Sequence, residues 1–250
     1  MKKCAFCPTV ATLTAEHCWA VWISELMPTD VFTIVRRNQD GTFKQWQTPD
    51  LNAKVKVVCG RCNNGWMSDL EGEAKATLGN MMLYGSPVSF LPIGIASIAA
   101  FAFKGAVIGT FMHPDRTLFY SDAIRHRFAK DRILPDGFQV WISSLSKQRG
   151  VFKSYWHETK PSSRYNFQLD VFTFAAGFFA LQAVTFKWTT RHDRRHTPPL
   201  FLTQNPIFDD IATPLWPNNG LAISWPPRKQ LPEASFEDFV TRWARLKFGL

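Results

Sequence analysis

The sequence has few charged residues, no internal repeat and no low-complexity tract. Charged residues make up 20% of the 250, and the 14 Gly and 16 Pro follow no period, which excludes a repeat architecture. No apolar stretch follows the basic start Met1-Lys2-Lys3, so we expect no signal peptide. Apolar residues make up 46% of the chain and include 22 Phe, which predicts a globular protein with a sizeable core.

The net charge of +9 is unevenly placed along the chain. Residues 1–85 hold nine Lys and Arg against eight Asp and Glu, whereas residues 86–250 hold twenty against twelve. A basic surface on this scale suits a polyanion such as nucleic acid. Charge that only keeps the protein in solution is an equally open interpretation.

One stretch, residues 90–112, is apolar enough to be tested as a membrane span. Lys104 lies near its middle, and a charge there costs about 2.5–3.5 kcal/mol on membrane insertion. We therefore expect a buried core helix, no membrane partner and a soluble, cytoplasmic protein.

Cysteine is scarce, and four of the five cysteines form two C-x2-C pairs: Cys4 with Cys7, and Cys59 with Cys62. Each pair is typical of a tight turn that points two thiolates at one metal ion, and two such knuckles supply the four soft ligands of tetrahedral zinc. A pair of disulfides is the alternative, but a cytosol keeps thiols reduced. The pattern thus predicts structural Zn²⁺, with Cys18 left over as a small buried residue.

The segments that follow the two knuckles give the N-terminal part a recognisable order. A Glu-His pair follows the first knuckle, the short β-branched run 55–58 predicts a strand into the second, and residues 66–83 have a helical composition. This order resembles the ββα-metal, treble-clef fold of the HNH endonucleases, and in particular their zinc-bearing subfamily. The matching elements are Cys4-Ala5-Phe6-Cys7, Glu16-His17, Cys59-Gly60-Arg61-Cys62-Asn63 and Glu71.

The resemblance covers about residues 1–75 and implies a nuclease site. It implies that His17 is the general base that activates a water molecule, which suits an imidazole near pH 7. It implies that Glu16 and Asn63 hold a catalytic divalent cation, Mg²⁺ or Mn²⁺, through hard oxygen atoms. Glu71 is expected to orient His17 or to contact that cation. One departure from the family is Lys54, which stands five residues before the second knuckle where an asparagine is usual.

Each of these residues also has a purely structural interpretation. His17 could hydrogen-bond within the finger, and Glu16 could be a surface charge. Asn63 could cap the helix that follows, because asparagine is a preferred N-cap residue. Glu71 could be a solvated helix residue, and the sequence leaves these alternatives open.

Residues 86–250 predict a larger mixed α+β domain of unassigned role. Residues 167–188 are apolar and aromatic, and Ala175-Ala176-Gly177 within them predicts two core strands joined by a turn or bend. Ser235-Phe236-Glu237-Asp238 resembles a capping box that starts a last helix, which we expect to run to residue 247. The other expected elements are helices at 92–112 and 121–133 and strands at 138–142 and 151–156.

Two clusters of basic residues lie in this second part. One is Arg191-His192-Asp193-Arg194-Arg195-His196, and the other comprises Arg125, Arg127, Lys130 and Arg132. Either cluster could grip phosphate groups or could be a solvated surface.

The fold class predicted from the sequence is therefore α+β, with a zinc-stapled ββα-metal module in residues 1–85 and a basic α+β domain in residues 86–250. The expected function is metal-dependent hydrolysis of phosphodiester bonds in nucleic acid, with DNA the expected substrate, in phage defence or on a mobile element. A non-catalytic zinc finger that binds nucleic acid or protein is the first alternative. A chain whose C-terminal part is a small-molecule sensor or assembly module is the second.

Overall fold

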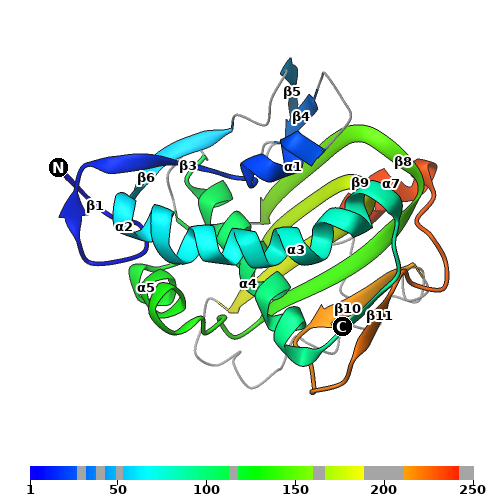
Figure 1. The fold of residues 1–250 in the computed structure, drawn as a ribbon. Coiled ribbons are helices and arrows are strands. Elements are labelled where there is room, and N and C mark those ends of the chain that lie inside the picture. Colours follow the sequence, from blue (N-terminus) through cyan, green and yellow to red (C-terminus); the bar gives the residue numbers. More distant parts are fainter. Residues whose placement is uncertain are drawn as a thin grey trace.

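The computed structural model describes residues 1–26, 32–37, 43–48, 53–112, 118–159, 167–188 and 211–241. Over these residues the fold is α+β, as the sequence predicts. The strands pair antiparallel, and two long helices, α3 (Ser68–Tyr84) and α4 (Pro92–Thr110), pack on each other and on strand β9 (Phe167–Trp188). Figure 1 shows α3 lying across the long, curved strands β8 and β9.

The N-terminal part has the predicted order of strands and helix. Strand β3 (Leu13–His17) pairs antiparallel with β6 (Lys54–Cys59), and the register shifts by one residue between Thr14 and Ala15. The short helix α2 (Gly60–Cys62), the π-type turn η1 (Asn63–Met67) and α3 then follow without a loop, with a kink at Gly65. The remaining short elements here are β1 (Lys2–Lys3), β2 (Val10–Ala11), α1 (Val21–Leu26), β4 (Phe32–Arg37) and β5 (Phe43–Thr48).

The largest sheet has the order β10-β8-β9, with β8 spanning Phe138–Thr159 and β10 spanning Ala212–Trp216. The expected pair of strands within residues 167–188 is wrong, because β9 is one continuous strand, and the separate strands expected at 138–142 and 151–156 are parts of β8. Gly177 absorbs the bend within the strand with φ of +58°, a left-handed conformation that glycine adopts without a side-chain clash.

Helix α4 is the core helix that the sequence predicts. Its length and composition would suffice to cross a membrane, but 78% of its most apolar window is buried inside the protein. Lys104 is buried with the apolar residues of the helix and finds its charge partners there. The helix is therefore positioned by packing on α3 and β9.

Helix α5 (Asp122–Asp131) matches the helix expected at 121–133, with the Ser121 hydroxyl capping its first turn. Two of the four basic residues near it are structural rather than surface groups. Arg125 is buried, and the Arg132 guanidinium stacks 4.2 Å from the ring centroid of Trp66. Arg127 and Lys130 are exposed.

One of the two hydrophobic core clusters among the described residues includes residues from both sides of the boundary that the sequence suggests at residue 85. It contains Cys4 and Phe6 of the first knuckle, Met82 of α3, Phe103 of α4 and Trp225 of β11 (Ile223–Trp225), a strand paired with β7 (Val88–Phe90). The described part of the last helix is α7 (Phe236–Thr241), which follows the turn η3 (Glu233–Ser235). The basic cluster 191–196 and residues 242–247 lie outside the described residues.

Candidate metal centre

The first knuckle lies in the tight turn between β1 and β2. The backbone N–H of Cys4 donates to the carbonyl oxygen of Thr9 (2.9 Å), which closes the turn. The backbone N–H of Phe6 lies 3.5 Å from the Cys4 Sγ, and the Phe6 ring is buried below the turn. Cys4 and Cys7 thereby point to the same side of the turn, toward the start of α2.

The second knuckle lies where β6 passes into α2. Cys59 ends the strand and Cys62 ends the short helix, and the N–H of Cys59 donates to the Cys4 Sγ (3.3 Å). The Sγ atoms of the four cysteines lie within 4.8 Å of one another. The Sγ atoms of Cys7 and Cys59 are 3.7 Å apart.

These distances fit a tetrahedral metal site and do not fit disulfides. Four sulfur atoms bound to zinc at about 2.3 Å stand about 3.8 Å apart at the corners of a tetrahedron, whereas a disulfide bond is about 2.05 Å long. All four cysteines are free. The predicted zinc ligands are thus brought together as a group that could hold one zinc ion.

The environment of the four thiols differs from one to the next. Although burial opposes it, hydrogen bonds from Thr9 and from neighbouring thiols lower the pKa of Cys7 to about 6. Burial raises the pKa of Cys4 and of Cys62. Cys18 is not part of this group: it is buried beside Met112, and burial raises its pKa to about 12. Its expected role as a small buried residue is confirmed.

The predicted base, His17, ends β3 and lies opposite Lys54 of β6, so the two side chains share one face of the strand pair. Lys54 is thus the residue paired with His17. The His17 side chain is half-buried.

Asn63 stands directly after the second knuckle and is joined to the strand that carries Glu16 and His17. Its side-chain amide donates to the Thr14 Oγ1 (3.0 Å) and to the carbonyl oxygen of Ala15 (3.2 Å). Its amide oxygen is not used in either bond. The start of the helical segment is thereby fixed against β3, immediately before the Glu-His pair.

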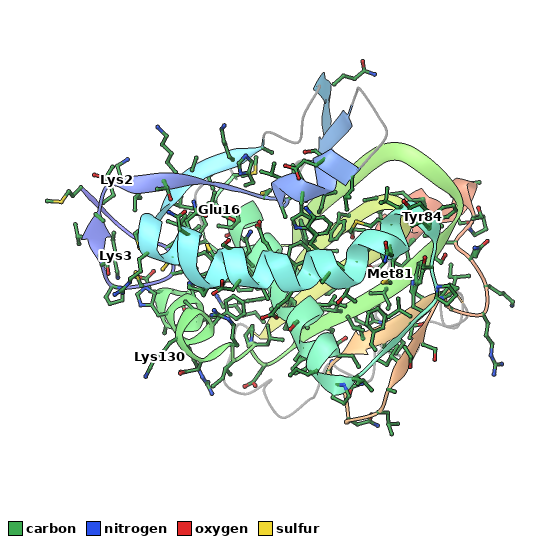
Figure 2. The ribbon with its side chains drawn as sticks, in the orientation of Figure 1. Lys2, Lys3, Glu16, Met81, Tyr84 and Lys130 are labelled. Carbon is green, nitrogen blue, oxygen red and sulfur yellow. The ribbon has the colours of Figure 1, made fainter. Side chains whose placement is uncertain are left out.

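Glu16 is buried, with 4% of its surface exposed, and its carboxylate contacts the ammonium group of Lys104 on α4. The same ammonium group contacts the carboxylate of Glu71 on α3. Figure 2 shows Glu16 between the strand pair β3–β6 and helix α3. The chain thus brings Glu16 and Glu71 together around a lysine, which sequence reasoning had not included in the site.

Lys104 attracts both carboxylates, but burial outweighs this attraction at Glu16 and, together with the nearby Glu71, raises the pKa of the Glu16 carboxyl. Although burial favours the neutral amine, Glu16 and Glu71 raise the pKa of Lys104 and keep it protonated. Lys104 therefore already supplies a positive charge at the Glu16 carboxylate, and a divalent cation bound to the same oxygen would meet that charge. The sequence carried one signal for this partner, because a lone lysine in a buried apolar helix must be paired.

Comparison of the chain with protein-family models, with curated proteins and with solved structures finds no match. The assignment of an activity therefore depends on the motifs and on the geometry of the four thiols, Asn63 and the Glu-His pair.

Proposed function

We propose that the chain is a zinc-stabilised, metal-dependent nuclease of the HNH type that hydrolyses phosphodiester bonds of nucleic acid, with DNA the expected substrate. The observation that carries the proposal is the contact of Asn63 with Thr14 and Ala15. It ties the residue after the second knuckle to the strand ending in Glu16-His17, beside a four-thiol group that could hold zinc. The cytoplasm is the proposed compartment, because it keeps such thiols reduced.

In the proposed chemistry, His17 acts as the general base. The imidazole takes a proton from a water molecule, the water oxygen forms a bond to phosphorus, and the bond from phosphorus to the leaving sugar oxygen breaks. That oxygen takes a proton from solvent, and the imidazolium of His17 later returns its own proton to solvent. A divalent cation, when bound, would neutralise the charge that develops on the phosphate. The Asn63 amide oxygen and the Glu16 carboxylate would hold it, provided that Lys104 moves from Glu16.

One observation favours a second candidate function. The Glu16 carboxylate is the predicted cation ligand, and it is already paired with the ammonium group of Lys104. If that pairing persists, the module is a zinc finger that binds nucleic acid without cutting it.

A cleavage assay discriminates between the two candidates. Supercoiled plasmid and labelled oligonucleotides are incubated with the zinc-loaded protein and Mg²⁺, Mn²⁺ or Ni²⁺. Under the nuclease proposal, His17→Ala lowers the cleavage rate roughly 100-fold or more, the usual contribution of a general base. His126→Ala, a histidine on α5, is the matched control and should cut at the wild-type rate.

Zinc content and thermal melting of both variants show whether each remains folded. Cleavage by wild type that survives in His17→Ala would remove the imidazole from the mechanism. A wild-type protein that binds but does not cut with any of the three cations would leave the non-catalytic finger as the function.

A further inference from the structure

A cavity of about 510 Å³ lies beside the first knuckle and outside the Glu16–Lys104–Glu71 cluster. Its walls come from β1, from the middle of β6, and from Arg125 and Asp122 of α5. Leu13, Val57 and Phe111 make part of its surface apolar. Its volume is in the range of about 300–1,000 Å³ that is usual for ligand pockets.

The charged side chains around this cavity are mostly basic: Lys2, Lys3, Lys56 and Arg125 face a single carboxylate, Asp122. The Lys3 Nζ and the Arg125 Nη2 each lie 2.5 Å from an oxygen of Asp122, so this carboxylate is shared by two cations. Arg125 is further committed, since its Nε donates to the carbonyl oxygen of Ala5 (2.8 Å). Lys3 and Arg125 therefore share the charge of Asp122, and the remaining positive charge lies at the rim of the cavity.

Lys2 and Lys56 supply that charge. Both are exposed, and among the described residues neither forms an ion pair with a carboxylate. Figure 2 shows Lys2 and Lys3 on β1 at the end of the molecule opposite Tyr84. Positive groups around a cleft with low-dielectric walls concentrate the field and attract anions.

The cavity lies along the same strand as the candidate base. Lys56 is two residues from Lys54 on β6, and Lys54 pairs with His17. Two residues of a strand span about 7 Å and return to the same face. A chain of phosphates that contacts Lys56 would therefore pass close to His17.

We infer that this cavity, bounded by Lys2, Lys3, Lys56 and Arg125, binds the phosphate backbone of a nucleic acid strand and leads it toward His17. The inference deepens the proposed function and names how that site holds its substrate. Lys2 and Lys56 make the phosphate contacts, whereas Arg125 holds the wall in shape through Ala5 and Asp122.

Binding is measured by fluorescence anisotropy with labelled single-stranded and double-stranded DNA. The full-length, zinc-loaded protein is used without Mg²⁺ or Mn²⁺, so that no cleavage occurs, and over a series of salt concentrations. The test variant is Lys2→Ala/Lys56→Ala. The matched control is Lys75→Ala/Arg228→Ala, which removes two exposed positive charges on α3 and near β11.

We expect the Kd of the test variant to rise about tenfold or more. The slope of log binding constant against log salt should fall in magnitude by about 1.4–1.8, since each lost phosphate contact contributes about 0.7–0.9. The control should keep the wild-type slope. Both variants replace exposed side chains, and unchanged melting temperatures would show that they remain folded.

Three results would overturn the inference. The first is an unchanged salt slope in Lys2→Ala/Lys56→Ala, and the second is an equal loss of binding in the control. The third is titration of inorganic phosphate to saturation at micromolar concentration, which would make the cavity a site for small phosphate ligands. If DNA binding depends on Lys2 and Lys56 but the protein never cuts DNA, the inference stands. Only the proposed nuclease activity is then refuted.

Discussion

At the scale of single residues, Lys104 determines how the N-terminal motifs are built into the protein. The Lys104 side chain is 1% exposed, and its ammonium group contacts the carboxylates of Glu16 and Glu71. Glu16 is also almost fully buried. A buried charge without a partner is costly, and the Lys104 ammonium group offsets part of the charge of the two carboxylates. Lys104 is therefore the group that makes it possible for Glu16 to lie inside the protein.

Replacing Lys104 by methionine is expected to destabilise the protein by about 3–5 kcal/mol, because Glu16 would remain buried without its cation. The measurement is the free energy of unfolding in urea. Lys75→Met is the control, since Lys75 forms only an exposed pair with Glu25 at 3.9 Å and should change stability by about 1 kcal/mol or less.

A second change tests the same pairing. Glu16→Gln combined with Lys104→Met should recover part of the lost stability, because the orphaned charge is gone. If Lys104→Met alone proves as stable as wild type, the contact of Lys104 with Glu16 does not contribute to stability.

At the scale of elements, the contact of α3 with β9 depends on one glycine. A Cβ atom built on Gly177 would lie 1.8 Å from the carbonyl oxygen of Met82 in α3, and the φ of Gly177 is +58°. Met82 contributes backbone there, which cannot swing aside as a side chain can. The close approach of helix and strand, and the continuity of β9 through its bend, both require that no side chain is present.

Gly177→Ala is accordingly expected to lower the melting temperature. The left-handed conformation alone costs an alanine about 1–2 kcal/mol, and separating Met82 from the strand adds to that cost. Gly72→Ala on α3 is the matched control, because a Cβ atom at Gly72 would meet nothing within 4 Å. It should be neutral or stabilising by up to about 1 kcal/mol. Equal melting temperatures for the two variants in calorimetry would mean that α3 and β9 leave room for a side chain at residue 177.

At the scale of the whole molecule, the four-thiol group and part of the long sheet belong to one core cluster, while other sheet residues form a second cluster. Cys4, Cys59 and Cys62 are buried in the same cluster as Phe103 of α4 and Phe179 of β9. Helix α4 touches the N-terminal module through Lys104 and the sheet through its apolar side chains. Loss of the metal is thus expected to be felt well beyond residue 85.

We expect one zinc ion per chain, released when the thiols are modified, and a melting temperature that falls by about 10 °C or more after its removal. Because the core is shared, unfolding should be a single cooperative transition followed equally by tryptophan fluorescence and far-UV circular dichroism. Two separate transitions, with only the first sensitive to zinc, would indicate independent units on either side of residue 85. A protein without bound zinc would refute the metal centre itself.

The sequence alone determined the local features of this protein. Two C-x2-C pairs predict a four-thiol site, β-branched residues before Cys59 predict β6, and the Lys104-bearing apolar run predicts α4. The strand and helix signals suffice because each depends on neighbours a few residues away. Each C-x2-C pair is also local, and the four ligands that one zinc ion requires imply that the two pairs meet. Tertiary structure alone decided the partners of Glu16 and Glu71, the continuity of β9 through Gly177, and the cavity beside Lys2 and Lys56. These depend on which distant segments meet in the core, since a buried charge must find its partner and a helix can approach a strand only where the side chains leave room.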